Sequence, residues 1–318
     1  MIDKNIYNII YNCCNLKKND NIFLLYDNST EEVLKLFTYF LDKKKINYYI
    51  LSIENVDMHG VEPISNKLKI SFKYKIVISL TKFSIAHTKY RENLTKKKIK
   101  FLSLPFYSKK ILNNSSLSVN FKKQTLLANK VGKILTKASH ISLFSNKGTN
   151  FYFKKLNAIT NINPGWCFKK EIIASPPDIE VNIPILGNSS YGKLVIDGSI
   201  TCDEIGLLKK TLSIEIEDGK IKKIYGEKSK ELINIFTNHN INKIMPAELG
   251  IGLNPKAKIC GNMLIDEGSL GSVHIGFGSN STIGGDKKIS FHLDHIIRKP
   301  TLYCDNILLI KQGKINIE

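Results

Sequence analysis

The chain has 318 residues, of which 42% are hydrophobic, and a formal net charge of +19 at pH 7. This length suits two domains, and the apolar fraction is that of a globular protein, which excludes a disordered or fibrous chain. No apolar run approaches the roughly 18 residues of a membrane span, so we expect no membrane partner.

Cysteine usage and the amino-terminal segment indicate where the protein works. The six cysteines are scattered and form no C-x-x-C pair. The first residues also lack the apolar stretch of a secretory signal. We therefore expect reduced thiols and a cytoplasmic protein.

The positive charge is concentrated in residues 1–150, which hold 26 Lys and Arg against 10 Asp and Glu. No acidic residue occurs between Glu92 and Glu171. A basic surface of this kind attracts phosphates or acidic partners. However, most of the basic residues are lysines in a chain also rich in Ile and Asn, as an AT-rich genome would encode, and no nucleic-acid-binding motif is present. We therefore expect no nucleic-acid partner.

The first half of the chain predicts alternating strands and helices. Short apolar runs indicate buried strands at 22–26, 48–51, 75–80 and 99–104. Between the first two, a hydroxyl at Ser29 or Thr30 and the acids Glu31 and Glu32 indicate a helix start. Strands separated by helices predict a parallel sheet, and the absence of G-x-G-x-x-G argues against a dinucleotide site.

The second half of the chain predicts a different arrangement of strands and helices. A helix near 121–138 and a hairpin of 140–145 with 150–153 precede a boundary at Asn163-Pro164-Gly165. Short strands then alternate with turns, a helix covers 229–238, and another short helix follows Glu267. We therefore predict an α/β amino-terminal domain over 1–164 and a β-rich α+β domain over 165–318, the latter containing the metal site.

Metal-binding side chains concentrate in glycine-rich sequence near the end of the chain. His292 and Asp294 are two positions apart, so on a strand they share one face, whereas His295 points to the other. His274 and Glu248 can join them from neighbouring strands. Imidazole with carboxylate suits zinc, iron, manganese or cobalt.

Four motifs carry a resemblance to a known family: Asp178-Ile179-Glu180-Val181, Ala247-Glu248-Leu249-Gly250, Asp266-Glu267 leading to His274, and His292-Leu293-Asp294. With them the chain resembles the aminopeptidase T type of metallo-aminopeptidases over nearly its whole length. The resemblance implies that two Zn²⁺, Co²⁺ or Mn²⁺ ions activate a water against a peptide bond, and that the protein is a homodimer. The implied ligands are Glu180, Glu248, His274, His292 and Asp294.

The same resemblance implies further roles. Glu267 is the expected acid–base group of the hydrolase, and Glu180 and Glu248 are the expected acid–base groups if the site instead holds a single metal ion. His87 lies in a segment similar to a His-Thr segment of that family, and we expect it, with Ser281, near a small-molecule or peptide substrate. Ser281 is also a departure, because the peptidases place a tyrosine ligand seven positions after this histidine.

A second family on the same fold gives an alternative interpretation. The 2,5-dihydroxypyridine ring-cleaving dioxygenases resemble these peptidases and use the equivalent His and His-x-Asp for one iron ion. Here that triad is His274, His292 and Asp294, the two-histidine, one-carboxylate arrangement of non-haem iron enzymes. The missing tyrosine fits this interpretation at least as well. The two hypotheses are a metal-dependent hydrolase and a mononuclear Fe(II) dioxygenase.

Overall fold

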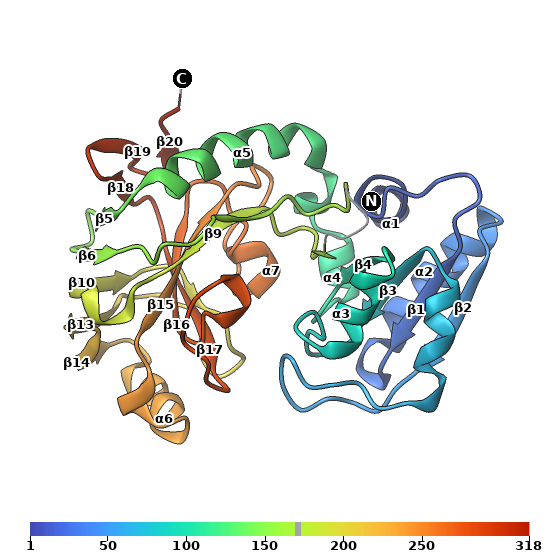
Figure 1. Ribbon diagram of the computed structural model, residues 1–318, viewed down its shortest axis with the longest axis horizontal. Coiled ribbons are helices and arrows are strands. Elements are labelled where there is room, and N and C mark those ends of the chain that lie inside the picture. The colour runs from blue at the N-terminus through green and yellow to red at the C-terminus, as the bar shows by residue number, and fades with distance from the viewer. Residues whose placement is uncertain (169–172, 318) are drawn as a thin grey trace. The chain divides into compact units, whose positions relative to one another are not determined.

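The computed structural model describes residues 1–168 and 173–317. Internal contacts divide the chain into two units (Figure 1). Unit 1 comprises Met1–Lys122 and Asn163–Pro176, and unit 2 comprises Lys123–Ile162 and Pro177–Glu318.

This division corrects the single boundary predicted at residue 164. The helix and hairpin of residues 123–162 belong to unit 2, because the hairpin strands pair with β10 and β18, far along the chain. Residues 163–176 belong to unit 1, because β8 pairs with β4. Local sequence patterns do not reveal such long-range pairing.

Unit 1 is built on a five-stranded parallel sheet of order β2-β1-β3-β4-β8. The strands β1, β3 and β4 are almost entirely buried, as their apolar runs predicted. In chain order the elements are α1 Ile2–Tyr7, η1 Asn8–Cys13, β1 Ile22–Tyr26, η2 Asn28–Thr30, α2 Glu31–Lys43, β2 Tyr48–Ser52, η3 Asn66–Lys73, β3 Ile76–Leu80, α3 Lys89–Lys96, β4 Lys100–Ser103, α4 Lys109–Leu112, η4 Ser115–Ser118 and β8 Ile173–Ala174.

The helix start after β1 differs from the prediction in one detail. The capping group is the Asp27 carboxylate, which accepts from the Ser29 amide at 3.1 Å, rather than a hydroxyl. The acids Glu31 and Glu32 do lie in the first turn of α2, where they favour the positive end of the helix dipole.

Unit 2 contains two larger sheets, of orders β14-β13-β10-β6-β5-β18-β19-β20 and β12-β11-β17-β16-β15-β9-β7. Its elements are α5 Phe121–Lys137, β5 His140–Phe144, β6 Asn150–Lys154, β7 Asn161–Asn163, β9 Glu180–Pro184, η5 Gly187–Ser189, β10 Tyr191–Ile196, β11 Ser199–Ile200, β12 Gly206–Leu207, β13 Leu212–Glu217, β14 Lys220–Gly226, α6 Ser229–Asn238, η6 Ile241–Lys243, β15 Pro246–Gly252, α7 Met263–Asp266, β16 Val273–Gly278, η7 Ser281–Ile283, β17 His292–Ile297, β18 Thr301–Cys304, β19 Ile307–Lys311 and β20 Lys314–Ile315. The predicted fold class, an α/β domain with a β-rich domain, is confirmed.

Two helices cover the seven-stranded sheet of unit 2. Helix α5 approaches β9 so closely at Gly132 that an added Cβ would lie 3.7 Å from Val181. Helix α6 inserts Phe236 against Phe277 of β16. The short helix α7 ends at Asp266, so the helix predicted to follow Glu267 in fact precedes it.

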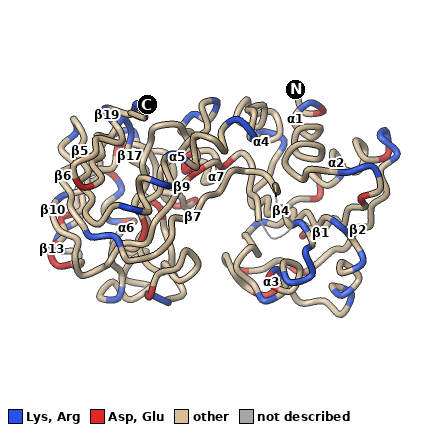
Figure 2. The backbone as a smooth tube through the Cα atoms, turned by 45° about the horizontal axis from the view of Figure 1, so that its top comes forward, with Lys and Arg blue, Asp and Glu red and all other residues tan. Residues whose placement is uncertain are grey.

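Lysine and arginine residues are distributed along the backbone of both units (Figure 2). Within the described parts of the chain, no helix combines the length and apolar character needed to cross a membrane.

Candidate metal centre

Four neighbouring antiparallel strands of unit 2, β17, β16, β15 and β9, carry the predicted ligands. Their register places the ligand positions on one face of the sheet, because side chains two positions apart on a strand point the same way. The other face is apolar and buried, with Leu249, Ile251 and Ile275 among its residues. A two-faced sheet of this kind brings together five side chains from distant parts of the chain: Glu180, Glu248, His274, His292 and Asp294.

A glycine lies opposite each ligand on the adjacent strand. Gly250 pairs with His274, and Gly276 lies between Glu248 on β15 and Asp294 on β17. A Cβ at Gly250 would lie 2.0 Å from His274 Nε2. A Cβ at Gly276 would lie 2.7 Å from His292 Cε1 and 2.9 Å from Asp294 Oδ1. The glycines therefore provide the space that the rings and carboxylates occupy, which explains the glycine-rich sequence.

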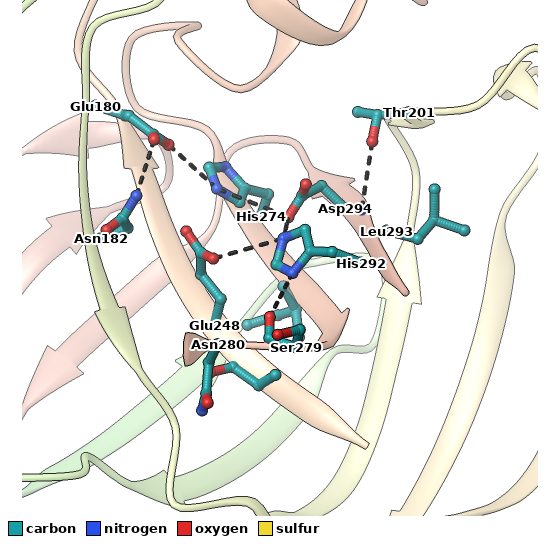
Figure 3. A network of polar contacts seen from close by, with 12 residues as sticks. Glu180, Asn182, Thr201, Glu248, His274, Ser279, Asn280, His292, Leu293 and Asp294 are labelled. Atoms are coloured by element: carbon teal, nitrogen blue, oxygen red, sulfur yellow. Dashed lines mark hydrogen bonds and ion pairs between the residues drawn. The ribbon is translucent and has the colours of Figure 1, made fainter. Parts of the chain in front are cut away.

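The ligand atoms converge (Figure 3). His274 Nε2 lies 3.3 Å from Glu180 Oε2 and 4.0 Å from Asp294 Oδ1. His292 Nε2 lies 3.2 Å from the same Asp294 oxygen and 3.5 Å from Glu248 Oε2. Glu180, Glu248 and His274 each offer a ligand atom within 4.8 Å of the other two. The structure thus gathers all five predicted ligands into one cluster.

Neighbouring groups orient the ligands. His292 Nδ1 lies 2.7 Å from the Ser279 carbonyl oxygen, which can only accept, so Nδ1 carries a hydrogen and Nε2 is the ring nitrogen that faces the carboxylates, 3.2 Å from Asp294 Oδ1. Asn182 donates to Glu180 Oε1 at 2.8 Å. The backbone N–H of Asp294 donates to Thr201 Oγ1 at 3.3 Å. The cluster is therefore held in place by hydrogen bonds around its edge.

The carboxylates interact strongly because they are shielded from water. Glu248 and Asp294 are each only 7% exposed. Burial, helped by the charges of Asp294 and Glu180, raises the pKa of Glu248 to about 7. For Asp294, burial acts in the upward direction, but His292 and His274 hold its pKa below the ordinary value.

The histidines show the complementary effect. Burial alone would lower the pKa of His274, but the hydrogen bond with Glu180 and the charge of Asp294 raise it to about 9. Burial likewise opposes the charged form of His292, while Asp294 and Glu248 raise its pKa to about 10. The carboxylates thus stabilise positive charge at this site, on the imidazole rings or on a bound cation.

The donor set fits a divalent metal ion. Two imidazole nitrogens and three carboxylates face one another, and no Lys or Arg in the described parts of the chain pairs with these carboxylates. Glu180 Oε2 is buried, and the group that faces it is His274 Nε2, 3.3 Å away. A cation at the centre would neutralise the carboxylates, that of Glu180 included.

The remaining candidates lie in different surroundings. Glu267, directly after α7, is half-buried, and burial together with the charges of Asp294 and Glu180 raises its pKa well above the ordinary value. Asp266 is structural, since it accepts from the amides of Cys260 at 2.7 Å and Gly261 at 2.8 Å.

The two predicted substrate residues are both exposed. Ser281 lies in η7, and its hydroxyl is 3.2 Å from that of Ser279, the residue whose carbonyl orients His292. His87 lies in unit 1, just before α3. Ser281 is therefore adjacent to the support of the cluster, whereas His87 belongs to the other unit.

His295 lies outside the cluster, as alternation along the strand predicted. Its ring packs against Phe277 with centroids 4.8 Å apart, and Nδ1 lies 3.0 Å from the Leu293 carbonyl oxygen. Burial lowers the pKa of His295 to about 4. This histidine is a neutral core residue.

Sequence reasoning missed the supporting residues. Asn182 could have been found, because it follows Glu180 by two positions on the same strand face. Ser279 acts through its backbone carbonyl, which no residue type signals. Asn280, fully within the core, donates to the carbonyl of Ala247 at 3.2 Å and so ties the loop that contains Ser279 to β15.

The two-unit fold and the histidine–carboxylate cluster are features of an enzyme, and similarity to known proteins identifies its family. The chain belongs to the 2,5-dihydroxypyridine 5,6-dioxygenase (NicX) family, whose model matches residues 5–317. A search of curated proteins found no match.

Two solved structures share the fold. The 2,5-dihydroxypyridine dioxygenase from Pseudomonas putida KT2440 is similar with a TM-score of 0.81 and 17% identity, covering 100% of this chain and 97% of the other. Wild-type AmpT from Thermus thermophilus is similar with a TM-score of 0.69 and 10% identity, covering 99% of each chain. Both predicted resemblances are confirmed, and both relatives are of the enzyme classes that they implied.

Proposed function

We propose that the protein is a mononuclear Fe(II)-dependent dioxygenase that opens a hydroxylated aromatic ring. The observation that carries the proposal is the convergence of His274 Nε2 and His292 Nε2 on the same oxygen of Asp294. Two imidazoles and one carboxylate are the ligands that non-haem iron oxygenases use. Membership of a family described by a dioxygenase supports this function over the metal-dependent hydrolase.

His274, His292 and Asp294 would hold the ion. When bound, Fe(II) supplies open coordination positions for dioxygen and for the oxygen atoms of a chelating substrate. The residues around it do the rest. Ser279 fixes the tautomer of His292, and the apolar far side of the sheet keeps the strand positions rigid.

Glu248 and Glu267 would handle protons. Glu248 Oε2 lies 3.5 Å from His292 Nε2, so its carboxyl group faces the position that the ion and its substrate would occupy. Its pKa of about 7 suits exchange near neutral pH. Glu180 is instead held by Asn182, so we assign it an orienting role beside His274.

The second candidate is a hydrolase with two ions. It is favoured by one observation, namely that Glu180 and Glu248 add carboxylate ligands beyond the three that one iron needs, within 4.8 Å of His274. Those extra ligands could hold a second divalent ion, as in the metallopeptidase hypothesis.

Metal analysis after anaerobic purification separates the two functions. The dioxygenase predicts about one iron per chain and dioxygen uptake with 2,5-dihydroxypyridine as the first ring tested. Two zinc-like ions per chain, with dipeptide cleavage and no dioxygen uptake, would establish the hydrolase instead. The homodimer and the cytoplasmic location stay predictions, which the mass in solution and cell fractionation test.

A further inference from the structure

The carboxyl edge of the parallel sheet in unit 1 has the topology of a ligand site. Strand β1 pairs with β2 on one side and β3 on the other, so the connections that leave β1 and β3 run in opposite directions. Open α/β sheets bind ligands at such a switch point, beyond the carboxyl ends of the strands. The residues that follow β1, β3 and β4 therefore lie where this topology places a ligand.

Three aromatic rings meet at this edge. Phe83 follows β3, Phe106 follows β4, and His59 comes from the segment after β2. The centroids of Phe83 and Phe106 are 5.5 Å apart at 77°, and His59 lies 5.3 Å from Phe83 and 5.5 Å from Phe106. His59 is exposed and both phenylalanines are half-buried, so the cluster keeps aromatic surface available to a partner.

Phe106 is held in an unusual backbone conformation. Its φ is +55°, and among the described non-glycine residues with positive φ it is the only aromatic one. A bulky residue in this region is disfavoured by roughly 1–2 kcal/mol. Its N–H donates to the carbonyls of Thr81 at 3.3 Å and Lys82 at 3.2 Å, which fix the ring beside Phe83. Such strain persists where surrounding structure maintains it, commonly at ligand sites.

Polar groups surround the rings. The Lys82 ammonium lies 5.2 Å from the Phe83 centroid, and its backbone N–H is held by Asp27 at 2.7 Å. The Ser84 hydroxyl lies 2.9 Å from that of Ser103, and the Ser84 N–H donates to His59 Nδ1 at 3.1 Å. A cation and hydroxyls beside aromatic surface are suited to a planar ring that carries an anionic oxygen.

We infer that the His59–Phe83–Phe106 cluster is a binding site in unit 1 for a planar aromatic ring bearing an anionic oxygen. The inference goes beyond the proposed function, whose metal cluster lies in unit 2, and rests on it only for the class of ligand, a hydroxylated or carboxylated aromatic ring. Phe83 and Phe106 contact the ring, and Lys82 recognises its negative charge.

The test measures binding to the metal-free full-length protein, so that the metal cluster contributes nothing through an ion. Nicotinate is the aromatic probe, and cyclohexanecarboxylate, with the same charge and no aromatic ring, is its control. Calorimetry or ligand-observed NMR gives the dissociation constants. We expect saturable binding of nicotinate that is at least about tenfold tighter than that of cyclohexanecarboxylate.

Two variants examine the cluster. Phe83→Leu keeps apolar bulk, and Phe106→Asn keeps a residue that tolerates positive φ. Each should weaken nicotinate binding by about tenfold while the melting temperature stays close to that of the parent protein. Phe72→Leu is the matched control, because Phe72 is also half-buried, packs on the same core and has Lys97 at 5.2 Å from its ring, yet precedes β3. It should change the constant by less than about twofold.

Three results would overturn the inference: no saturable binding, equal binding of cyclohexanecarboxylate, or Phe83→Leu and Phe106→Asn behaving like Phe72→Leu. Loss of nicotinate binding in His274→Ala would also overturn it, by locating the ring at the metal cluster. A protein that lacks iron-dependent dioxygen uptake but binds nicotinate through Phe83 and Phe106 contradicts the proposed function alone.

Discussion

The sheets of the two units use their surfaces in opposite ways. In unit 1 the parallel strands β1, β3 and β4 are buried on both faces, so chemistry is confined to the loops at their ends. In unit 2 the strands β9, β15, β16 and β17 place polar ligands on one face and apolar side chains on the other. The difference is that in unit 2 the face of the sheet itself carries the proposed metal site, because glycines opposite the candidate ligands leave room for them.

The largest expected effect comes from removing a shared ligand. Asp294 lies within 4.0 Å of both histidine Nε2 atoms, so Asp294→Ala should abolish stoichiometric iron binding and lower activity by at least about 10³-fold. Metal content and dioxygen uptake measure both. Asp266→Asn serves as a control for a buried carboxylate outside the cluster, and equal iron content in Asp294→Ala and the parent protein would refute the proposed ligand set.

His295, on the apolar face of the sheet, should make the free energy of unfolding depend on pH. The pKa of His295 is about 4 in the folded protein and about 6.5 when unfolded, so the unfolded state binds more protons between these values. The stabilisation is complete above pH 6.5 and is lost as pH falls toward 4, by roughly 3 kcal/mol. His295→Gln should remove this part of the pH dependence. Chemical denaturation of both metal-free proteins from pH 4 to 7 measures the difference, and parallel curves would contradict the assignment.

The glycines should be sensitive to a single methyl group. Gly276→Ala places a Cβ against His292 and Asp294, so iron affinity should fall by about 100-fold. Gly132→Ala is the control. The atom nearest to its added Cβ would be Ile162 Cδ1, at 2.9 Å, which is the flexible end of a side chain. Iron titration compares the two. Unchanged affinity in Gly276→Ala would mean that the ligands do not need that space.

The smallest expected effect comes from removing the hydrogen bond that orients the Glu180 carboxylate. Asn182→Ala removes the hydrogen bond to Glu180 Oε1, and iron affinity should fall by about tenfold without loss of folding. A competitive chelator measures the change. If Asn182→Ala binds iron as tightly as the parent protein, Glu180 has no orienting role beside His274.

The sequence predicted unit 1 better than unit 2, for a physical reason. A buried parallel strand is a continuous apolar run, so the sequence of Ile76–Leu80 indicates a strand directly. The strands of unit 2 pair across long separations, as β5 does with β18, and this pairing moved the unit boundary away from residue 164.

The candidate site was predictable only in part. The spacing of His292 and Asp294 signals a shared strand face, and the nearby glycines indicate close approach. Glu180 came from a family resemblance, because nothing in local spacing connects it to a histidine 94 residues later. Ser279 contacts His292 through its backbone carbonyl, and Thr201 accepts from the backbone N–H of Asp294. Contacts that involve the backbone cannot be predicted from residue types.

The most direct test of the central claim is anomalous diffraction at the iron edge from crystals of the anaerobically Fe(II)-loaded protein. The proposed site predicts one peak per chain, about 2.0–2.2 Å from His274 Nε2, His292 Nε2 and an Asp294 carboxylate oxygen. A pair of peaks, with the second held by Glu180 and Glu248, or no peak within reach of Asp294, would contradict it.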